Sequence, residues 1–183
     1  MITRARVSGC FDSSFVAGLV LLAFALAGAL LSGALLGLAG AAFDPVTRAV
    51  LTGLAALAVL LGALTRPVPW QLDRETDRRW LDYHDWRTAA LNGFALGLGF
   101  TTRIGYWLFY FVLLAAFAIA DPVLAAAGTA AYALSRVGGS LLLAATGIEV
   151  AGRGWIPRLR TATDAVLFAA LGHLAVVLVR SLV

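Results

Sequence analysis

One arginine, Arg136, lies inside a long run of apolar residues and is the most informative polar side chain of the sequence. It stands fourteen residues after Pro122 and thirteen before Glu149. On helical spacing, Tyr132 and Ser140 lie one turn to either side and share its face. This grouping predicts either a site for an anionic or polar substrate or an arginine that locks two helices through hydrogen bonds.

A second ionisable group, His173, lies in the last apolar run, nine residues after Asp164. At about 1.5 Å of rise per residue, His173 and Arg136 both lie deep within their runs. We therefore expect them to form one buried polar cluster between the last two helices. A neutral histidine donates and accepts hydrogen bonds, so it could relay a proton; the alternative is a bond to a neighbouring helix.

A third polar group, Thr101, Thr102 and Arg103, interrupts an apolar run just after three glycines. Broken helices expose backbone groups that bind substrate in transporters. Thr102 and Arg103 are therefore candidate binding residues. The alternative for Arg103 is a boundary arginine whose side chain reaches the lipid headgroups.

The remaining candidate for chemistry is a charged cluster of Asp82, His84 and Asp85. Two carboxylates and one histidine are common by chance in a charged loop, and no second histidine stands at helical spacing. We therefore predict no metal site. The sequence has no nucleophile elbow, phosphate-binding loop or zinc-protease motif, so it predicts no cofactor, and no motif argues for an enzyme.

These side chains are set in a very apolar chain of 183 residues, 61% hydrophobic and 13% charged. A soluble domain carries roughly a quarter charged residues. The mean hydropathy is +0.90, and the apolar residues form long blocks that need lipid as their solvent. The sequence predicts an all-α fold, a polytopic transmembrane helical bundle in one domain, residues 1–183.

Five apolar blocks are the predicted spans: 14–42, 49–64, 91–120, 123–148 and 165–183. The first is longer than a ~30 Å hydrocarbon layer requires, so its helix tilts, extends or breaks. For the third, one solution has a re-entrant or interfacial segment at 91–100 before a helix from Ile104 to Ala120. The other is one long tilted helix that holds Arg103 inside the protein.

Local signals place the ends of these helices. Phe43-Asp44-Pro45 is predicted to close the first block, and Pro122 to stand in the first turn of the helix after Asp121. In that helix, small residues at four-residue spacing form a ridge suited to close helix packing. The ridge consists of Ala127, Ala131, Ser135 and Gly139.

Every cationic residue is an arginine, which, with abundant alanine, leucine and glycine, indicates a GC-rich bacterial genome. The arginines flank the apolar blocks and form no stripe, so nucleic acid is not a predicted partner. Ten fall on one side of the predicted topology, including the loop 66–88, and only Arg48 and Arg180 on the other. Because cationic residues concentrate in cytoplasmic loops, we predict a bacterial inner-membrane protein with a cytoplasmic N-terminus and an external C-terminus.

The only cysteine, Cys10, cannot form an internal disulfide and has no CxxC partner. Residues 7–10 spell a lipoprotein cleavage box, but no apolar segment precedes the box, whereas Arg4 and Arg6 do. We therefore expect Cys10 to be dispensable.

The segment LNGFALGLGFTTRIG at 91–105, followed by YALSR at 132–136, resembles the second half of CcdA-type membrane proteins. These thiol and electron carriers of cytochrome c biogenesis are placed in the LysE-like transporter group. The resemblance implies a glycine-rich broken helix, followed by a helix that carries a Y-x-L-G type segment. It also implies two three-helix halves related by inversion. The paired cysteines of that family are absent here, so thiol shuttling is not implied, and five predicted spans stand against the family's six.

Together these features predict a small transporter or carrier-like membrane protein with a polar site around Arg136. One alternative is a non-catalytic accessory subunit that acts through another membrane or redox protein. Another is an intramembrane enzyme on a lipid or quinone-like substrate, with His173 as acid or base. Membrane lipids are the expected partners, and a homo-oligomer remains open.

The ten-to-two arginine bias makes the topology testable. A reporter that is active only outside the cytoplasm should give signal when fused after Val183, and none when fused at Asp77. Measuring reporter activity against expression level checks both fusions. A silent fusion after Val183 together with an active one at Asp77 would invert the whole topology.

Overall fold

The computed structural model describes residues 7–65, 86–99, 106–139, 141 and 155–182, and all regular elements among them are helices. They are α1 (Val7–Ala41), α2 (Pro45–Thr65), α4 (Trp86–Leu98), α5 (Leu108–Ile119), α6 (Pro122–Ala133), the π-helical segment η2 (Leu134–Gly138) and α8 (Trp155–Leu182). The predicted all-α class is confirmed for this part of the chain.

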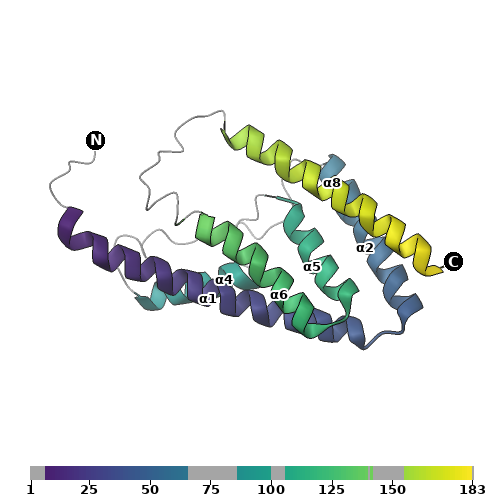
Figure 1. The fold of residues 1–183 in the computed structure, drawn as a ribbon, viewed down its shortest axis with the longest axis horizontal. Helices are drawn as coiled ribbons and strands as arrows, with labels where there is room; N and C mark the ends of the chain where they lie inside the picture. The colour runs from purple at the N-terminus through teal and green to yellow at the C-terminus, as the bar shows by residue number, and fades with distance from the viewer. Residues whose placement is uncertain (1–6, 66–85, 100–105, 140, 142–154, 183) are drawn as a thin grey trace.

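The longest helix, α1, runs along one side of the molecule, with α4, α5 and α6 packed against it and α2 and α8 farther away (Figure 1). Helices α4 and α6 pack directly on α1, and α5 packs on α6 and α1. Although a short turn joins α2 to α1, α2 packs on α5, and α8 lies across α2 and α5. The order of packing therefore places α8 on the opposite side of the bundle from α1.

Helix α1 is continuous over 35 residues, or roughly 52 Å at the standard helical rise. Of the three possibilities left open for this block, a break is therefore wrong, and tilt or extension remains. Four of its glycines, Gly28, Gly33, Gly37 and Gly40, lie where another part of the chain comes close. The backbones of α4, of α6 or of the α5–α6 turn occupy the space that their side chains would need.

Asp44 ends the turn between α1 and α2 as predicted. Its Oδ1 accepts hydrogen bonds from the backbone N–H groups of Val46 and Thr47, each at 3.0 Å, and Pro45 opens the helix. Hydrogen bonds, foremost from the Thr47 side chain, hold the pKa of Asp44 below its ordinary value. This cap lets α2 start four residues before the predicted span, which makes it 21 residues long.

The turn between α5 and α6 uses the same device. Ala120 has a left-handed φ of +53°, and Asp121 Oδ1 accepts hydrogen bonds from the N–H groups of Val123 at 2.8 Å and Leu124 at 3.0 Å. Pro122 occupies the first helical position, which confirms the predicted helix start.

The third predicted span is two helices, α4 and α5. Gly99 ends α4 with a φ of +74°, a conformation that glycine alone adopts readily. The Phe109 ring fills the space of a Cβ at Gly99, so a side chain is excluded there for a second reason. One long tilted helix is therefore wrong, and α5 begins four residues after the predicted Ile104. Whether α4 is re-entrant or interfacial stays a prediction.

Close backbone contact joins α4 to α1. A Cβ on Gly93 would meet the carbonyl of Leu21, and one on Gly97 the carbonyl of Ala25. From the other side, a Cβ on Gly28 would lie 2.5 Å from the carbonyl oxygen of Phe94. Small residues four apart allow such close approach of two helices, and the pairing shows that α4 runs parallel to α1.

Helix α6 packs on α1 in the opposite direction, through Ala125 and Thr129 against Gly33 and through Asp121 against Gly37. The buried face of α6 thus contains Ala125, Thr129 and Ala133. The predicted packing ridge is on the wrong face within this chain, because its members Ala127, Ala131 and Ser135 are exposed. Both faces carry small residues, and only the fit to α1 distinguishes them.

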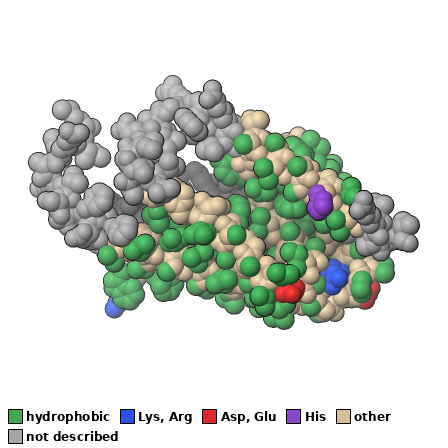
Figure 2. Space-filling model, in the orientation of Figure 1, with side chains coloured by type: hydrophobic (Ala, Val, Ile, Leu, Met, Phe, Trp, Pro, Cys, Tyr) green, Lys and Arg blue, Asp and Glu red, His purple; other side chains and the backbone are tan. Residues whose placement is uncertain are grey.

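Two described helical segments are long and apolar enough to cross a membrane. They are Val16–Ala41, with a mean hydropathy of 2.5, and Pro45–Thr65, with 1.9. Only 33% of the first and 11% of the second is buried within the protein. On the face that Figure 2 shows, apolar side chains cover much of the described part, and the charged side chains there are isolated.

The α1–α4 contact makes a prediction about stability. Gly97→Leu should disrupt the packing of α4 on α1, since no space exists for a side chain. Overpacking of this kind costs about 1–3 kcal/mol, or roughly 2–12 °C in melting temperature for a chain of this length. Thermal unfolding of the purified protein in detergent measures it.

Gly128→Leu is the matched control, because nothing lies within 4 Å of a Cβ at Gly128. It should melt close to the unmodified protein. Equal losses of stability in both variants would contradict the proposed role of Gly97.

Candidate functional site

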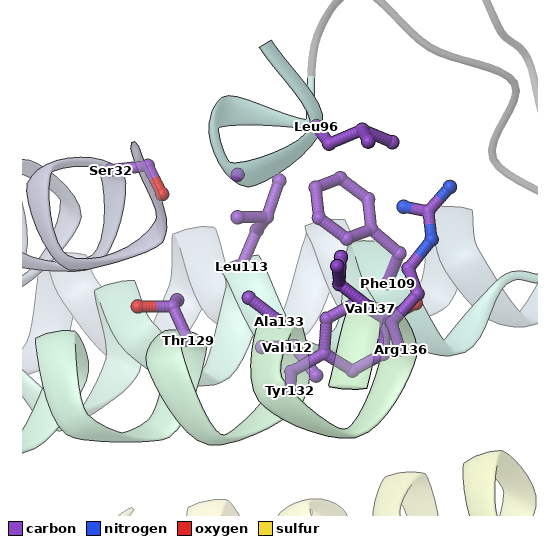
Figure 3. Close-up of a pocket in the computed structure, with 11 residues that line it drawn as sticks. Ser32, Leu96, Phe109, Val112, Leu113, Thr129, Tyr132, Ala133, Arg136 and Val137 are labelled. Atoms are coloured by element: carbon purple, nitrogen blue, oxygen red, sulfur yellow. The ribbon is translucent and has the colours of Figure 1, made fainter. Parts of the chain in front are cut away.

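A small cavity lies where α1, α4, α5, α6 and η2 meet (Figure 3). Its polar lining consists of Ser32, Thr129, Tyr132 and Arg136, and the other lining residues are apolar or glycine. The cavity has room for about one water molecule. Arg136 is the one charged side chain among the described lining residues, so the cavity favours an anionic or polar occupant.

Arg136 lies in a segment where the winding of the helix changes. From Leu134 to Gly138 the chain leaves the α-helical pattern and winds as a π-helix. The Ser135 hydroxyl donates a hydrogen bond of 2.8 Å to the Tyr132 carbonyl within this widened turn. Single π turns inside α-helices are rare and occur frequently at functional sites.

The widened turn determines where Arg136 points. Figure 3 shows its side chain extending past Phe109 toward Leu96, which lies in the last turn of α4. Arg136 is half-buried and lines the cavity.

Two hydroxyl groups at the other end of the cavity share one acceptor on α1. Thr129 Oγ1 donates to the Ala29 carbonyl at 2.7 Å, and Ser32 Oγ lies 3.0 Å from the same oxygen. Thr129 is also 3.0 Å from the Ala125 carbonyl of its own helix. Because their protons are directed to backbone carbonyls, these hydroxyls offer lone pairs to the cavity.

Sequence reasoning missed Ser32 and Thr129. The available signal was weak: Thr129 is a polar residue at four-residue spacing from Ala125 and Ala133, and Ser32 is a polar residue within the glycine-rich first block. Of the predicted site residues, the structure brings Arg136 and Tyr132 together at the cavity. Thr102, Arg103 and Ser140 lie outside the described residues, as do Asp82, His84 and Asp85.

The predicted buried cluster of Arg136 with His173 is wrong. His173 is exposed, and no described residue of α8 lines the cavity. The buried face of α8 contains Leu167 and Leu171, which pack with Val59 and Trp107 of the neighbouring helices. His173 follows Leu171 by two residues, or about 200° around the helix, so it points away from the bundle.

No protein-family model, curated protein or solved structure matches this chain. The resemblance to CcdA-type carriers therefore stays a prediction. Among the described residues, no group of three histidine, cysteine or carboxylate side chains is arranged to hold a metal ion.

The bond between Thr129 and Ala29 is testable by isosteric replacement. Thr129→Val keeps the shape of the side chain against Gly33 but removes the donor. Hydrogen bonds between membrane helices average about 0.6 kcal/mol and reach about 1.7, so the melting temperature should fall by roughly 1–7 °C. Thr129→Ser retains the hydroxyl and should lose less. If the serine variant is the less stable of the two, the bond does not hold these helices together.

Proposed function

We propose that this chain is a transporter or carrier-like protein of a bacterial inner membrane, with five passes and its polar site at the Arg136 cavity. The apolar surface supports membrane residence. A helix of 21 residues with a mean hydropathy of 1.9 and only 11% burial, as α2 has, leaves a large apolar face uncovered. A soluble protein rarely leaves so large an apolar face exposed to water, whereas in a membrane the hydrocarbon layer would surround it.

The directions of the helices support the five passes. Contacts make α4 and α5 parallel to α1, and α6 antiparallel to it. The turn after α1 and the turn after α5 lie at one end of the bundle, where the rings of Phe43 and Phe117 are 5.8 Å apart. Counting α4 and α5 as one broken pass, α1, α2, α4–α5, α6 and α8 alternate in direction (Figure 1).

The observation that carries the transport proposal is Arg136 in a π-helical turn beside a broken pass. An arginine within an apolar bundle is costly and is retained where it binds or pairs. Secondary transporters bind substrate where discontinuous helices end near the middle of the membrane. Here Arg136 faces the last turn of α4, close to the break at Gly99. The substrate of such a site is a small anionic or polar solute.

A second candidate function, an accessory subunit, is favoured by a different observation. The small-residue ridge of Ala127, Ala131 and Ser135 is exposed, and nothing lies within 4 Å of a Cβ at Gly128. Ridges of this kind allow the close approach of another membrane helix. Such a helix would belong to a partner protein or to a second copy of the chain.

Arg136→Lys separates a binding role from a folding role. Lysine keeps the positive charge but loses the planar fork that pairs with an anion. A hydrogen bond to a charged group is worth about 1.5–3 kcal/mol, so solute flux should fall by roughly tenfold or more with little change in melting temperature. The measurement is swelling of protein-containing liposomes in a panel of small organic and inorganic anions.

His173→Ala is the control, since His173 is exposed and distant in packing from the cavity, and its flux should be unchanged. Liposomes that swell no faster with the unmodified protein than without it, for every solute, would reject transport. Loss of a co-purifying partner in an Ala131→Leu variant would then favour the accessory subunit.

A further inference from the structure

The cavity has room for about one water molecule, so a solute enters only if a wall moves. Four of its walls are fixed by tight contacts of α1 with α4, α5 and α6. The contact between α6 and α1 extends from Asp121, which packs against Gly37, to Thr129, which packs against Gly33. The remaining wall is η2, which contributes Arg136 and Val137.

The end of α6 is held by side chains and not by close backbone contact: beyond η2, the Leu141 side chain lies 2.9 Å from a Cβ built on Gly18 of α1. A Cβ at Gly139 would meet nothing within 4 Å, and one at Gly138 only the side chain of Leu134, one turn earlier in the same segment, at 3.5 Å. These two glycines directly follow the π-helical turn. Helices bend at π turns and at glycine pairs, and both features coincide here.

The contact that closes this wall centres on one side chain. Val137 is buried in a cluster that contains Ala17, Leu21 and Ala25 of α1 and Ala89 of α4, and Leu96 and Leu141 pack against the same cluster. Fully burying one valine side chain is worth about 1.5–3 kcal/mol, and a cost of that size allows a reversible movement.

We propose that residues 134–139 are a hinge that opens and closes the cavity. Bending there moves Arg136 and Val137 away from α4 and α5, while Thr129 and the rest of α6 stay on α1. The proposal rests on the proposed function only in treating this cavity as the site that a solute enters. It assigns the opening movement to one short segment of a helix that is otherwise fixed.

Cysteine labelling tests the hinge without any knowledge of the solute. In a Cys10→Ser background, Leu113→Cys places the only thiol in the cavity wall on α5. A small charged methanethiosulfonate should react with it slowly, because it reaches the thiol only in the open state. Gly139→Ala should slow labelling about fivefold, the factor that corresponds to the ~1 kcal/mol difference between glycine and alanine in a helix.

Gly128→Ala is the matched control, with equally open space on the same helix but outside the hinge, and it should leave the rate unchanged. Val137→Ala should accelerate labelling, since it weakens the contact that closes the wall. Melting temperatures of all variants show whether the fold is retained.

Three outcomes would overturn the hinge. They are equal rates for the Gly139 and Gly128 variants, no reaction of the cavity thiol at all, and a reaction as fast as that of the unfolded protein. Failure of the flux assay with the expected labelling pattern would reject transport but retain the hinge. The two proposals therefore fail separately.

Discussion

The close approach of helix backbones along α1 is the constraint on which the rest of the structure depends. In the membrane that we propose for this chain, lipid tails are as apolar as leucine, so its helices gain little from burying apolar side chains against one another. What remains is dispersion at short range. Gly93 and Gly97 on α4 and Gly33 and Gly37 on α1 let the backbones approach to that range, and any side chain there would separate the helices.

This constraint also creates the polar site. Because α6 lies so close to α1, the Thr129 hydroxyl reaches the Ala29 carbonyl across the interface at 2.7 Å. The same approach brings Ser32 to one end of the cavity and, by the direction of α6, Arg136 to the other. The small residues that let α6 pack on α1 therefore also determine how far the hydroxyl groups of Ser32 and Thr129 lie from Arg136.

The parts of the fold that sequence reasoning predicted are those that local chemistry determines. Asp44 and Asp121, each followed by a proline, fix their turns within a few residues of chain, so both turns and the start of α6 could be predicted. The packing face of α6 was not, because Ala127 and Ala125 both belong to plausible small ridges and only α1 selects between them. His173 was misplaced for the same reason, since a short connection does not dictate which helices pack.

The π-helical turn could not be predicted either, and it matters most for function. Single π turns are rare, and no feature of the local sequence predicts one here. Here Val137 packs against alanines of α1, while Arg136 extends toward the end of α4. Arg136 and Val137 both belong to this π-helical segment and both line the cavity. The proposed binding residue therefore lies in the same short segment that we propose as the hinge.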